Sequence, residues 1–152
     1  MPDHPEPSRK REAFIPSGWR AFYEETGVPA AVRSGRTLYV TGHTGEAADG
    51  VFPADAEAQV RGTFRNIEIT LAEAGLGWHD VVAMNSYHVG FHEQVPALLA
   101  VAAEFLAEPF PAWTAVGVTE LIDPEAVIEI SCVACAYSPA TTTVFLPACL
   151  AS

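Results

Sequence analysis

The sequence predicts an α+β fold in which one mixed β-sheet carries two helices on one of its faces. Two segments repeat apolar residues at helical spacing, and the segments around them resemble strands. Their order is strand, strand, helix, strand, helix, strand, strand, which suits helices gathered on one side of a sheet. The chain has 152 residues, of which 49% are hydrophobic and 18% are charged. This size and composition predict a single domain with one buried core.

The N-terminal part is expected to combine a tail with a short docking arm. Residues 1–12 are polar and rich in proline, which predicts a solvated tail. Residues 13–25 carry four aromatic side chains, and we expect an ordered arm or a turn of helix that docks through them. Residues 30–34 form a weak strand candidate, followed by a turn at Gly35.

Residues 37–43 (TLYVTGH) predict the next strand because apolar and polar residues alternate along them. A regular strand would place two sets of side chains on opposite faces: Leu38, Val40 and Gly42 on one, Tyr39, Thr41 and His43 on the other.

A helix is predicted to follow a loop at residues 45–50. Asp55 suits the N-cap position and Gly75 suits the C-terminal end. Apolar residues between them recur at spacings of four, three and four, which marks one helical face: Val60, Phe64, Ile67 and Leu71.

The remaining elements are predicted from similar signals. Residues 81–90 form a strong strand candidate, and residues 93–107 a helix that ends before two prolines. Residues 112–118 and 126–137 predict the last two strands, joined by a turn near Asp123. The expected domain therefore spans 13–137, and we expect 138–152 to form a loose C-terminal extension.

Charge and composition exclude several classes of function. The formal net charge is −11, and the dense basic cluster Arg9-Lys10-Arg11 lies in the expected tail, so we expect no nucleic-acid partner. Lys10 is the only lysine, so the domain lacks a Schiff-base lysine for pyridoxal-phosphate or class I aldolase chemistry. The sequence shows no apolar run of about 18 residues and no secretory leader, and it has three cysteines. We therefore expect a cytoplasmic protein with no membrane partner.

Three segments in sequence order resemble the RidA/YjgF (Rid) family: VPAAVRSGRTLYVTGHTG (28–45), QVRGTFRNIEITLAEAGLGWHDVVAMNSYHVG (59–90) and PAWTAVGVTELIDPEAVIEISCVACA (111–136). The resemblance implies a chorismate-mutase-like α+β fold assembled as a homotrimer, with a barrel-like core and clefts between subunits. It also implies hydrolysis of reactive imines or enamines without a metal or an organic cofactor. Other members of the family are described as endoribonucleases, but the acidic charge argues against that role here.

The family's deaminase site carries over only in part. The arginine that binds the substrate carboxylate, in the family motif PAR, is replaced by Trp113, and an indole cannot form the bidentate grip of a guanidinium. The family tyrosine aligns near Pro29 and the helical asparagine near Leu99, so both are missing. The resemblance retains Gly42 and the acid of the last strand, Glu129.

Glu129 is also a candidate from the residues alone. Alternation places it with Val127, Ser131 and Val133 on one face of the last strand, opposite an apolar face. A carboxylate in so apolar a strand requires pairing, hydrogen bonds or access to water, and partial burial would raise its pKa toward the range of proton transfer. The alternative is a structural glutamate at a subunit contact.

The other candidates line the same expected cleft. Trp113 shares a strand face with the small residues Ala115 and Gly117, which predicts a slot for a flat, apolar or cationic ligand; interface packing is the alternative. His43 replaces a frequent family glutamine and could line the cleft or a surface. Tyr87 and His88 lie on opposite faces of their strand, and one of these faces should point at the trimer core.

Metal and redox sites are not expected. His88 and His92 span a strand end and a turn, without an acidic or cysteine partner nearby in sequence. Cys132 and Cys135 resemble a CxxC motif, but in a strand they point to opposite faces, so small core residues are the better interpretation.

The sequence thus predicts a diverged, cofactor-independent Rid-family enzyme acting on a small imine, enamine or related metabolite of a catabolic or specialised biosynthetic pathway. Glu129 would position water or move the proton, and a backbone N–H near Gly42 or residue 115 would stabilise developing negative charge. Any substrate carboxylate would need another basic group, with Arg33 or Arg36 as candidates. The alternative is a non-catalytic trimer that binds a small molecule.

Overall fold

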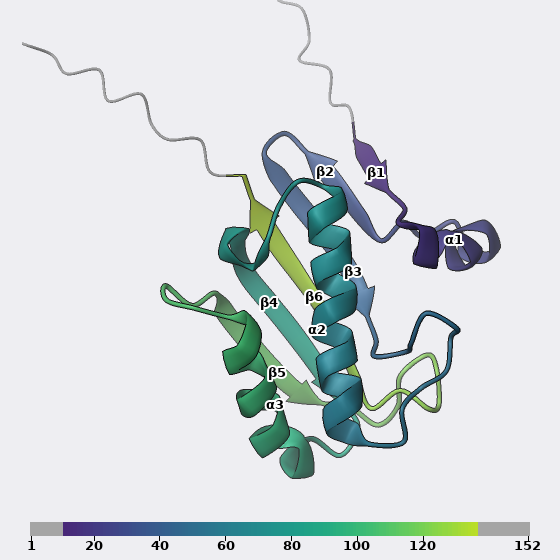
Figure 1. Ribbon diagram of the computed structural model, residues 1–152, viewed down its shortest axis with the longest axis vertical. Helices are drawn as coiled ribbons and strands as arrows, with labels where there is room; N and C mark the ends of the chain where they lie inside the picture. The colour runs from purple at the N-terminus through teal and green to yellow at the C-terminus, as the bar shows by residue number, and fades with distance from the viewer. Residues whose placement is uncertain (1–10, 137–152) are drawn as a thin grey trace, which may run out of the picture.

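The computed structural model describes residues 11–136 and consists of one six-stranded sheet covered by helices on one face (Figure 1). The strands follow the spatial order β1-β2-β3-β6-β4-β5, and only β4 and β5 run parallel. Their bounds are β1 Glu12–Phe14, β2 Ala31–Ser34, β3 Thr37–His43, β4 Val81–His88, β5 Ala112–Gly117 and β6 Ile128–Cys135.

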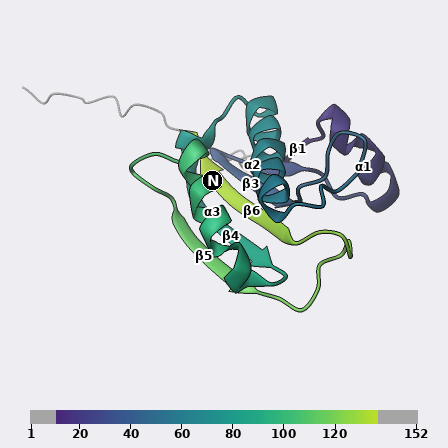
Figure 2. The same ribbon diagram turned by 60° about the horizontal axis from the view of Figure 1, so that its bottom comes forward.

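Two long helices, α2 (Ala56–Glu73) and α3 (Phe91–Phe105), lie side by side over the sheet (Figures 1 and 2). Asp55 caps α2 by accepting a hydrogen bond from the Ala58 N–H at 2.8 Å, as its sequence position predicts. The predicted sheet with two helices on one face is confirmed. The other face of the sheet carries no element of the described chain.

The N-terminal arm is more regular than the sequence suggested. It forms β1, the 3-10 turn η1 (Ser17–Trp19) and the short helix α1 (Arg20–Thr26). Glu12 already pairs with Arg33 in the sheet, so the expected tail of residues 1–12 ends earlier than predicted. Trp19 docks the arm by donating to the Val28 carbonyl at 2.9 Å. The expected docking through aromatic side chains is thus present.

Two element ends differ from the prediction for a local reason. The strand expected at 81–90 ends at His88, and the helix expected from residue 93 begins at Phe91. Gly90 adopts a φ of 73°, which glycine reaches at little cost, and this turn lets the helix begin earlier. The extension expected at 138–152 lies outside the described residues.

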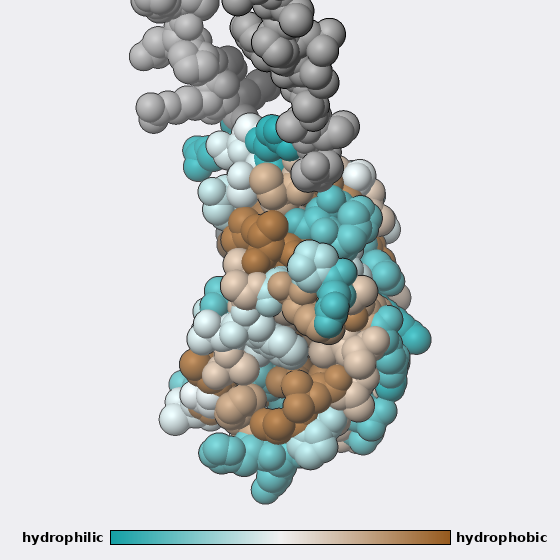
Figure 3. All heavy atoms as spheres, turned by 90° about the vertical axis from the view of Figure 1, so that its left-hand side faces the viewer, coloured by the Kyte–Doolittle hydropathy of each residue, from teal (hydrophilic) through white to brown (hydrophobic). Residues whose placement is uncertain are grey.

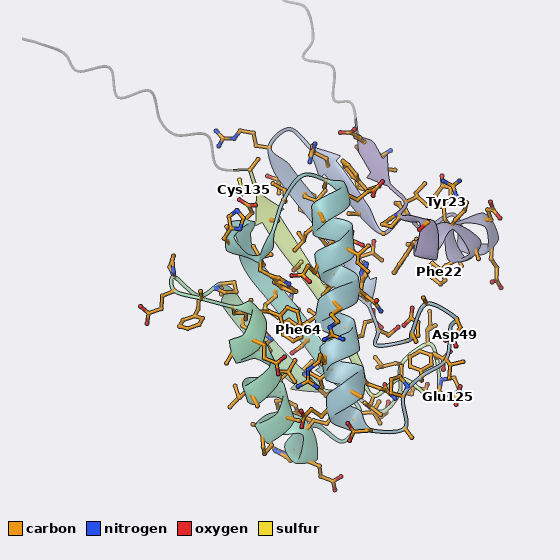
Figure 4. All side chains as sticks on the ribbon, in the orientation of Figure 1. Phe22, Tyr23, Asp49, Phe64, Glu125 and Cys135 are labelled. Atoms are coloured by element: carbon orange, nitrogen blue, oxygen red, sulfur yellow. The ribbon has the colours of Figure 1, made fainter. Side chains whose placement is uncertain are left out.

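The core lies between the helices and the covered face of the sheet. Phe64 on α2 stacks on Phe105 of α3 with ring centroids 5.2 Å apart, and it lies at the centre of the molecule in Figure 4. Trp78, on the 3-10 turn η2 (Trp78–Asp80), packs against both rings. Fully buried aliphatic side chains from three elements (β3, α2 and β6) complete this core: Leu38, Val60, Ile67, Leu71, Ile128 and Ile130.

The uncovered face of the sheet has a different character. Tyr39 lies between the buried Leu38 and Val40 and is 53% exposed. Val116 of β5, on the same face, is also exposed. Figure 3 views the neighbouring edge of the molecule, formed by β5 and α3, and shows apolar patches there as well. Within the described residues, no helix combines the length and the apolar character needed to cross a membrane.

Candidate functional site

The candidate site lies on the uncovered face, at the end of the sheet where β6 begins. Glu129 of β6 pairs in register with Tyr87 of β4, so both side chains leave the sheet on the same face. They line a cavity of about 620 Å³. The loop between β5 and β6 supplies the other lining residues: Val118, Glu120, Leu121 and Ile122.

Glu129 is half-buried, as the alternation in its strand predicts. The side chains on either side of it, Ile128 and Ile130, are fully buried on the helix-covered face. Burial removes water from the carboxylate and raises the pKa of Glu129 above the ordinary glutamate value. A carboxyl group of this kind can take up and release protons closer to neutral pH.

Gly42 makes room for this carboxylate. A Cβ at position 42 would lie 1.9 Å from Oε1 of Glu129 and 2.7 Å from its Cδ. Real Cβ atoms do not approach other atoms so closely, so a side chain here would displace the carboxyl group. The two residues that the family resemblance retains are therefore in direct contact.

Gln59 of α2 fixes the loop that lines the cavity. Its buried amide donates to the carbonyls of Pro53 and Glu125, at 2.9 Å each, and accepts from the Val127 N–H at 3.0 Å. These bonds connect the helix to the segment immediately before Glu129. The sequence analysis missed this role, although a glutamine next to Val60 on the apolar side of the helix was an available signal.

His43 does not line the cavity, and the prediction that it shares a face with Tyr39 is wrong. A β-bulge between Val40 and His43 shifts the register of β3 and turns His43 to the covered face. The imidazole is 1% exposed, bonds to Thr70 Oγ1 at 2.8 Å and stacks on Trp19 at 4.4 Å. Burial lowers the pKa of His43 to about 4.

His88 also lies on the covered face and belongs to a buried hydrogen-bond chain. Its Nε2 is 2.8 Å from Ser86 Oγ, and its Nδ1 is 3.0 Å from Gln94 Oε1. The Gln94 amide group donates to the carbonyls of Val89 and Val127, which leaves Oε1 as an acceptor. His88 therefore carries its proton on Nδ1, and Nε2 accepts from the Ser86 hydroxyl.

Trp113 completes this chain and does not face Glu129. Its indole Nε1 donates to Ser86 Oγ at 2.9 Å, and the ring packs against the core. Trp113 and Ala115 pair in register with Met84 and Ser86, which are buried under the helices. The expected slot floored by the indole is therefore on the opposite face of the sheet from the Glu129 carboxylate.

The other residues considered from the sequence also lie outside the cavity. Arg33 donates to the Ala74 carbonyl, and Arg36 donates to the Ala136 carbonyl, so neither lines the site. Leu99 is exposed on α3. In the described part of the chain, no group of three or more His, Cys, Asp or Glu side chains is arranged to hold a metal ion.

The two cysteines of the CxxC-like segment lie as the strand geometry predicts. Cys132 is buried and Cys135 is partly exposed, and both are free. Burial raises the pKa of the Cys132 thiol to about 12, so this thiol is a core group rather than a nucleophile.

The loop residues of the cavity were missed because they were assigned to a simple turn. The connection between β5 and β6 has no periodic pattern of apolar residues that would predict its structure. It contains four of the lining residues: Val118, Glu120, Leu121 and Ile122. The signal available was composition, since two adjacent large aliphatic residues are unusual in an exposed connection. Ile122 is 93% exposed.

The chain matches a known protein family over most of its length. The model of the family described as Endoribonuclease L-PSP matches residues 22–136, which is most of the chain. This chain belongs to the RidA/YjgF family. It is 41% identical over 113 residues to the RutC family protein YjgH of Escherichia coli (strain K12), covering 74% of this chain and 86% of that protein. The family resemblance seen in the sequence is therefore confirmed.

Further relatives within the RidA/YjgF family agree in sequence and fold. A 2-iminobutanoate/2-iminopropanoate deaminase of Dermatophagoides farinae is 36% identical over 97 residues, covering 60% of this chain and 72% of that protein. A solved structure of protein YjgH superposes with a TM-score of 0.76 at 38% identity, covering 82% of this chain and 95% of that chain. A YjgF/YER057c/UK114 family structure from Mycobacterium tuberculosis gives 0.72 at 30% identity, covering 84% and 100%. The RidA-like fold predicted from the sequence is thus confirmed.

Proposed function

We propose that this RidA/YjgF family protein is a diverged enzyme that hydrolyses a small imine, enamine or related metabolite of a catabolic or specialised biosynthetic pathway, without a cofactor. The observation that carries the proposal is the half-buried Glu129 carboxylate, which shares the uncovered face and a cavity with Tyr87. A relative described as an imine deaminase supports the reaction class. We place the protein in the cytoplasm, which agrees with the two free cysteines of the described chain.

Glu129 would act first as a base and then as an acid. As a carboxylate it would accept a proton from water while the oxygen attacks the imine carbon. It would then return that proton to the nitrogen and pass the remaining hydroxyl proton to the leaving nitrogen, while the C–N bond breaks with its electron pair on nitrogen to release ammonia and a carbonyl product. Burial raises the pKa of Glu129, which brings its acid and base forms closer in energy at neutral pH than those of an exposed glutamate. A backbone N–H near Gly42 is a candidate to stabilise negative charge on the substrate oxygen.

We further propose a homotrimer with the sites in clefts between subunits, as in the family resemblance. The uncovered sheet face supports this assembly, because it exposes Tyr39 and Val116. The cavity opens beside that face, so a neighbouring subunit could close it.

A non-catalytic small-molecule-binding trimer is the second candidate. One observation favours it: within residues 11–136 the Glu129 carboxylate has no hydrogen-bond or ion-pair partner, so only its packing at Gly42 orients it. A binding protein would retain the cavity and show no turnover.

Glu129→Gln separates the two functions. Imines generated in situ by an amino-acid oxidase and by an amine oxidase would be followed for ammonia release with and without protein. We expect the wild type to accelerate hydrolysis and Glu129→Gln to lower the rate by about 10²-fold or more, as for loss of a general acid–base group, with ligand binding retained. Glu125→Gln, an exposed carboxylate of the same loop, serves as the control and should keep full activity. Binding without acceleration of any imine would support the second candidate.

A further inference from the structure

The lining of the Glu129 cavity carries a distinctive charge. Two of its six residues are carboxylates, Glu120 and Glu129, and none of the six is basic. A substrate carboxylate placed here would meet two negative groups with no lining cation to offset them. Like charges at close range oppose binding, whereas a cation would be attracted by both groups.

Three arginines of the folded domain are engaged in other contacts. Arg33 lies within 3.6 Å of Glu12 and stacks over Phe14, and Arg36 donates to a backbone carbonyl at the far end of β6. Arg61 pairs with Glu57 and Glu104 on the helical side. The folded domain has no lysine. Within residues 11–136, no positively charged side chain lines the cavity.

The rest of the lining is apolar. Val118, Leu121 and Ile122 present aliphatic side chains on the loop opposite Tyr87 and Glu129. Ile122 is almost fully exposed, so a hydrocarbon group that rests against it would remove apolar surface from water. The phenol ring of Tyr87 adds a flat face that can contact an apolar body or a cation.

We propose that the substrates of this cavity are cationic imines with an apolar body and no carboxylate, the class formed by oxidation of primary amines rather than of amino acids. Glu120 is the residue that sets this preference, and Glu129 is the group that reacts. The inference rests on the proposed function for the chemistry, but the charge preference is also measurable by binding alone.

The reaction balances without a further reactant. An iminium ion, R₂C=NH₂⁺, and one water give R₂C=O and NH₄⁺. The water oxygen forms a bond to carbon, the π pair of the C=N bond moves to nitrogen and Glu129 takes one water proton. The same carboxyl group then protonates nitrogen. The C–N bond breaks, the remaining hydroxyl proton passes through Glu129 to the released ammonia, and the carboxylate is restored.

The test uses pairs of imines that differ only in the carboxylate. An amine oxidase acting on 2-phenylethylamine or 3-methylbutylamine supplies one member, and an amino-acid oxidase acting on phenylalanine or leucine supplies the other. We expect the full-length protein to accelerate hydrolysis of the amine-derived imine at least about tenfold more than that of its partner. A larger effect on the amino-acid-derived imine would overturn the inference and leave the proposed function standing.

Glu120→Gln tests the assigned residue. Removing one of two charges close to the substrate should lower the preference about fivefold, the effect expected for a single exposed charge at about 4 Å. Glu120→Lys should reverse the preference, and Glu125→Gln should leave it unchanged. An unaltered preference in both Glu120 variants would show that this residue does not set it. Circular dichroism spectra would confirm that the exposed substitutions leave the fold intact.

Direct binding separates failure of this inference from failure of the proposed function. Calorimetric titration with 2-phenylethylamine and with phenylalanine, which are stable saturated analogues, measures the charge preference without turnover. If the amine binds at least about tenfold more tightly than phenylalanine, and Glu120→Lys abolishes this difference, the charge assignment is supported. This holds even if no imine is hydrolysed, and then only the proposed function fails. Equal or weaker binding of the amine would overturn the inference.

Discussion

At the scale of single residues, Glu129 shows how burial can oppose stability and favour chemistry. Its carboxylate lies between two fully buried isoleucines along β6, and partial loss of water raises its pKa. A group with a raised acid pKa costs folding stability once the pH exceeds the ordinary glutamate value. Such a cost fits a group retained for proton transfer, and the approach of Gly42 fixes where the carboxyl group can lie.

Gly42→Ala is expected to lower kcat/KM for imine hydrolysis by about 10²-fold, the scale of a displacement of about 1 Å at a reacting group. The added Cβ would overlap the Glu129 carboxyl group, which must move to another rotamer. Steady-state ammonia release measures the effect. Gly18→Ala, which adds a Cβ in open space, is the control and should change neither activity nor Tm. Wild-type activity in Gly42→Ala would mean that the position of Glu129 is not set by this contact.

His43 predicts an acid-dependent loss of stability. Its pKa is lowered from 6.5 to about 4 in the folded state, so the folded protein binds fewer protons than the unfolded chain between these values. The stability contributed by neutral His43 is fully present above pH 6.5 and is lost as the pH falls toward 4. The limit is about 3 kcal/mol for a shift of this size.

Urea unfolding at a series of pH values would measure this loss. The difference in free energy of unfolding between wild type and His43→Asn should shrink as the pH falls from 6.5 to 4. A difference that stays constant over this range would contradict the buried, neutral imidazole.

At the scale of elements, the site depends on polar side chains of the helices that hold sheet ends and loops. Gln94 of α3 binds the carbonyls of Val89 and Val127, and it orients His88 through its Oε1. Gln59 of α2 binds both sides of Ala126, through Glu125 and Val127. Two helices on the covered face thus position the segment that enters β6 and places Glu129 on the other face.

Gln59→Leu should lower the free energy of unfolding by at least ~2 kcal/mol, because it leaves three backbone groups without their partners. Urea denaturation would measure the change. Activity measured well below the unfolding transition should also fall, since the cavity loop loses its attachment to α2. Glu73→Leu, an exposed site on the same helix, is the matched control. A variant with wild-type stability would show that these bonds are replaced by water without cost.

At the scale of the whole molecule, the sheet is covered on one side only. The helices close the covered face of the sheet over a packed core. No such layer from the described part of the chain covers the other face, where Tyr39 and Val116 are exposed. A half-covered sheet of this size requires either polar side chains or another layer on the free face. The proposed trimer supplies that layer.

Tyr39→Glu tests the assembly. Tyr39 pairs in register with Val133 on the uncovered face, and a charge there would be buried in a trimer. We expect the variant to shift toward a monomer by light scattering coupled to gel filtration, with circular dichroism unchanged. Ile69→Glu, at 56% exposure on α2, should leave the oligomeric state as in the wild type. If wild type is a monomer at micromolar concentration, the trimer proposal is wrong.

Periodic apolar patterns, together with the residues that mark helix ends, predicted most of the helices and strands. The alternation around Glu129, the Asp55 cap and the apolar face of α2 each depend on neighbouring residues along the chain, so the sequence alone determined them. The resemblance of three segments determined the family for the same reason, and it selected Gly42 and Glu129, which are in contact in the structure.

Only the tertiary structure decided which face each side chain occupies and what it meets there. A bulge of one residue in β3 turned His43 into the core, and pairing of β5 with β4 placed Trp113 beside Ser86, away from Glu129. Register shifts and strand partners arise from contacts between residues far apart in the chain, and a shift of one residue reverses the face of every following side chain. The cavity loop from Val118 to Ile122 has no periodicity, so only the tertiary structure placed it beside Glu129. In that structure Gln59 holds the later part of the same connection, at Glu125 and Val127.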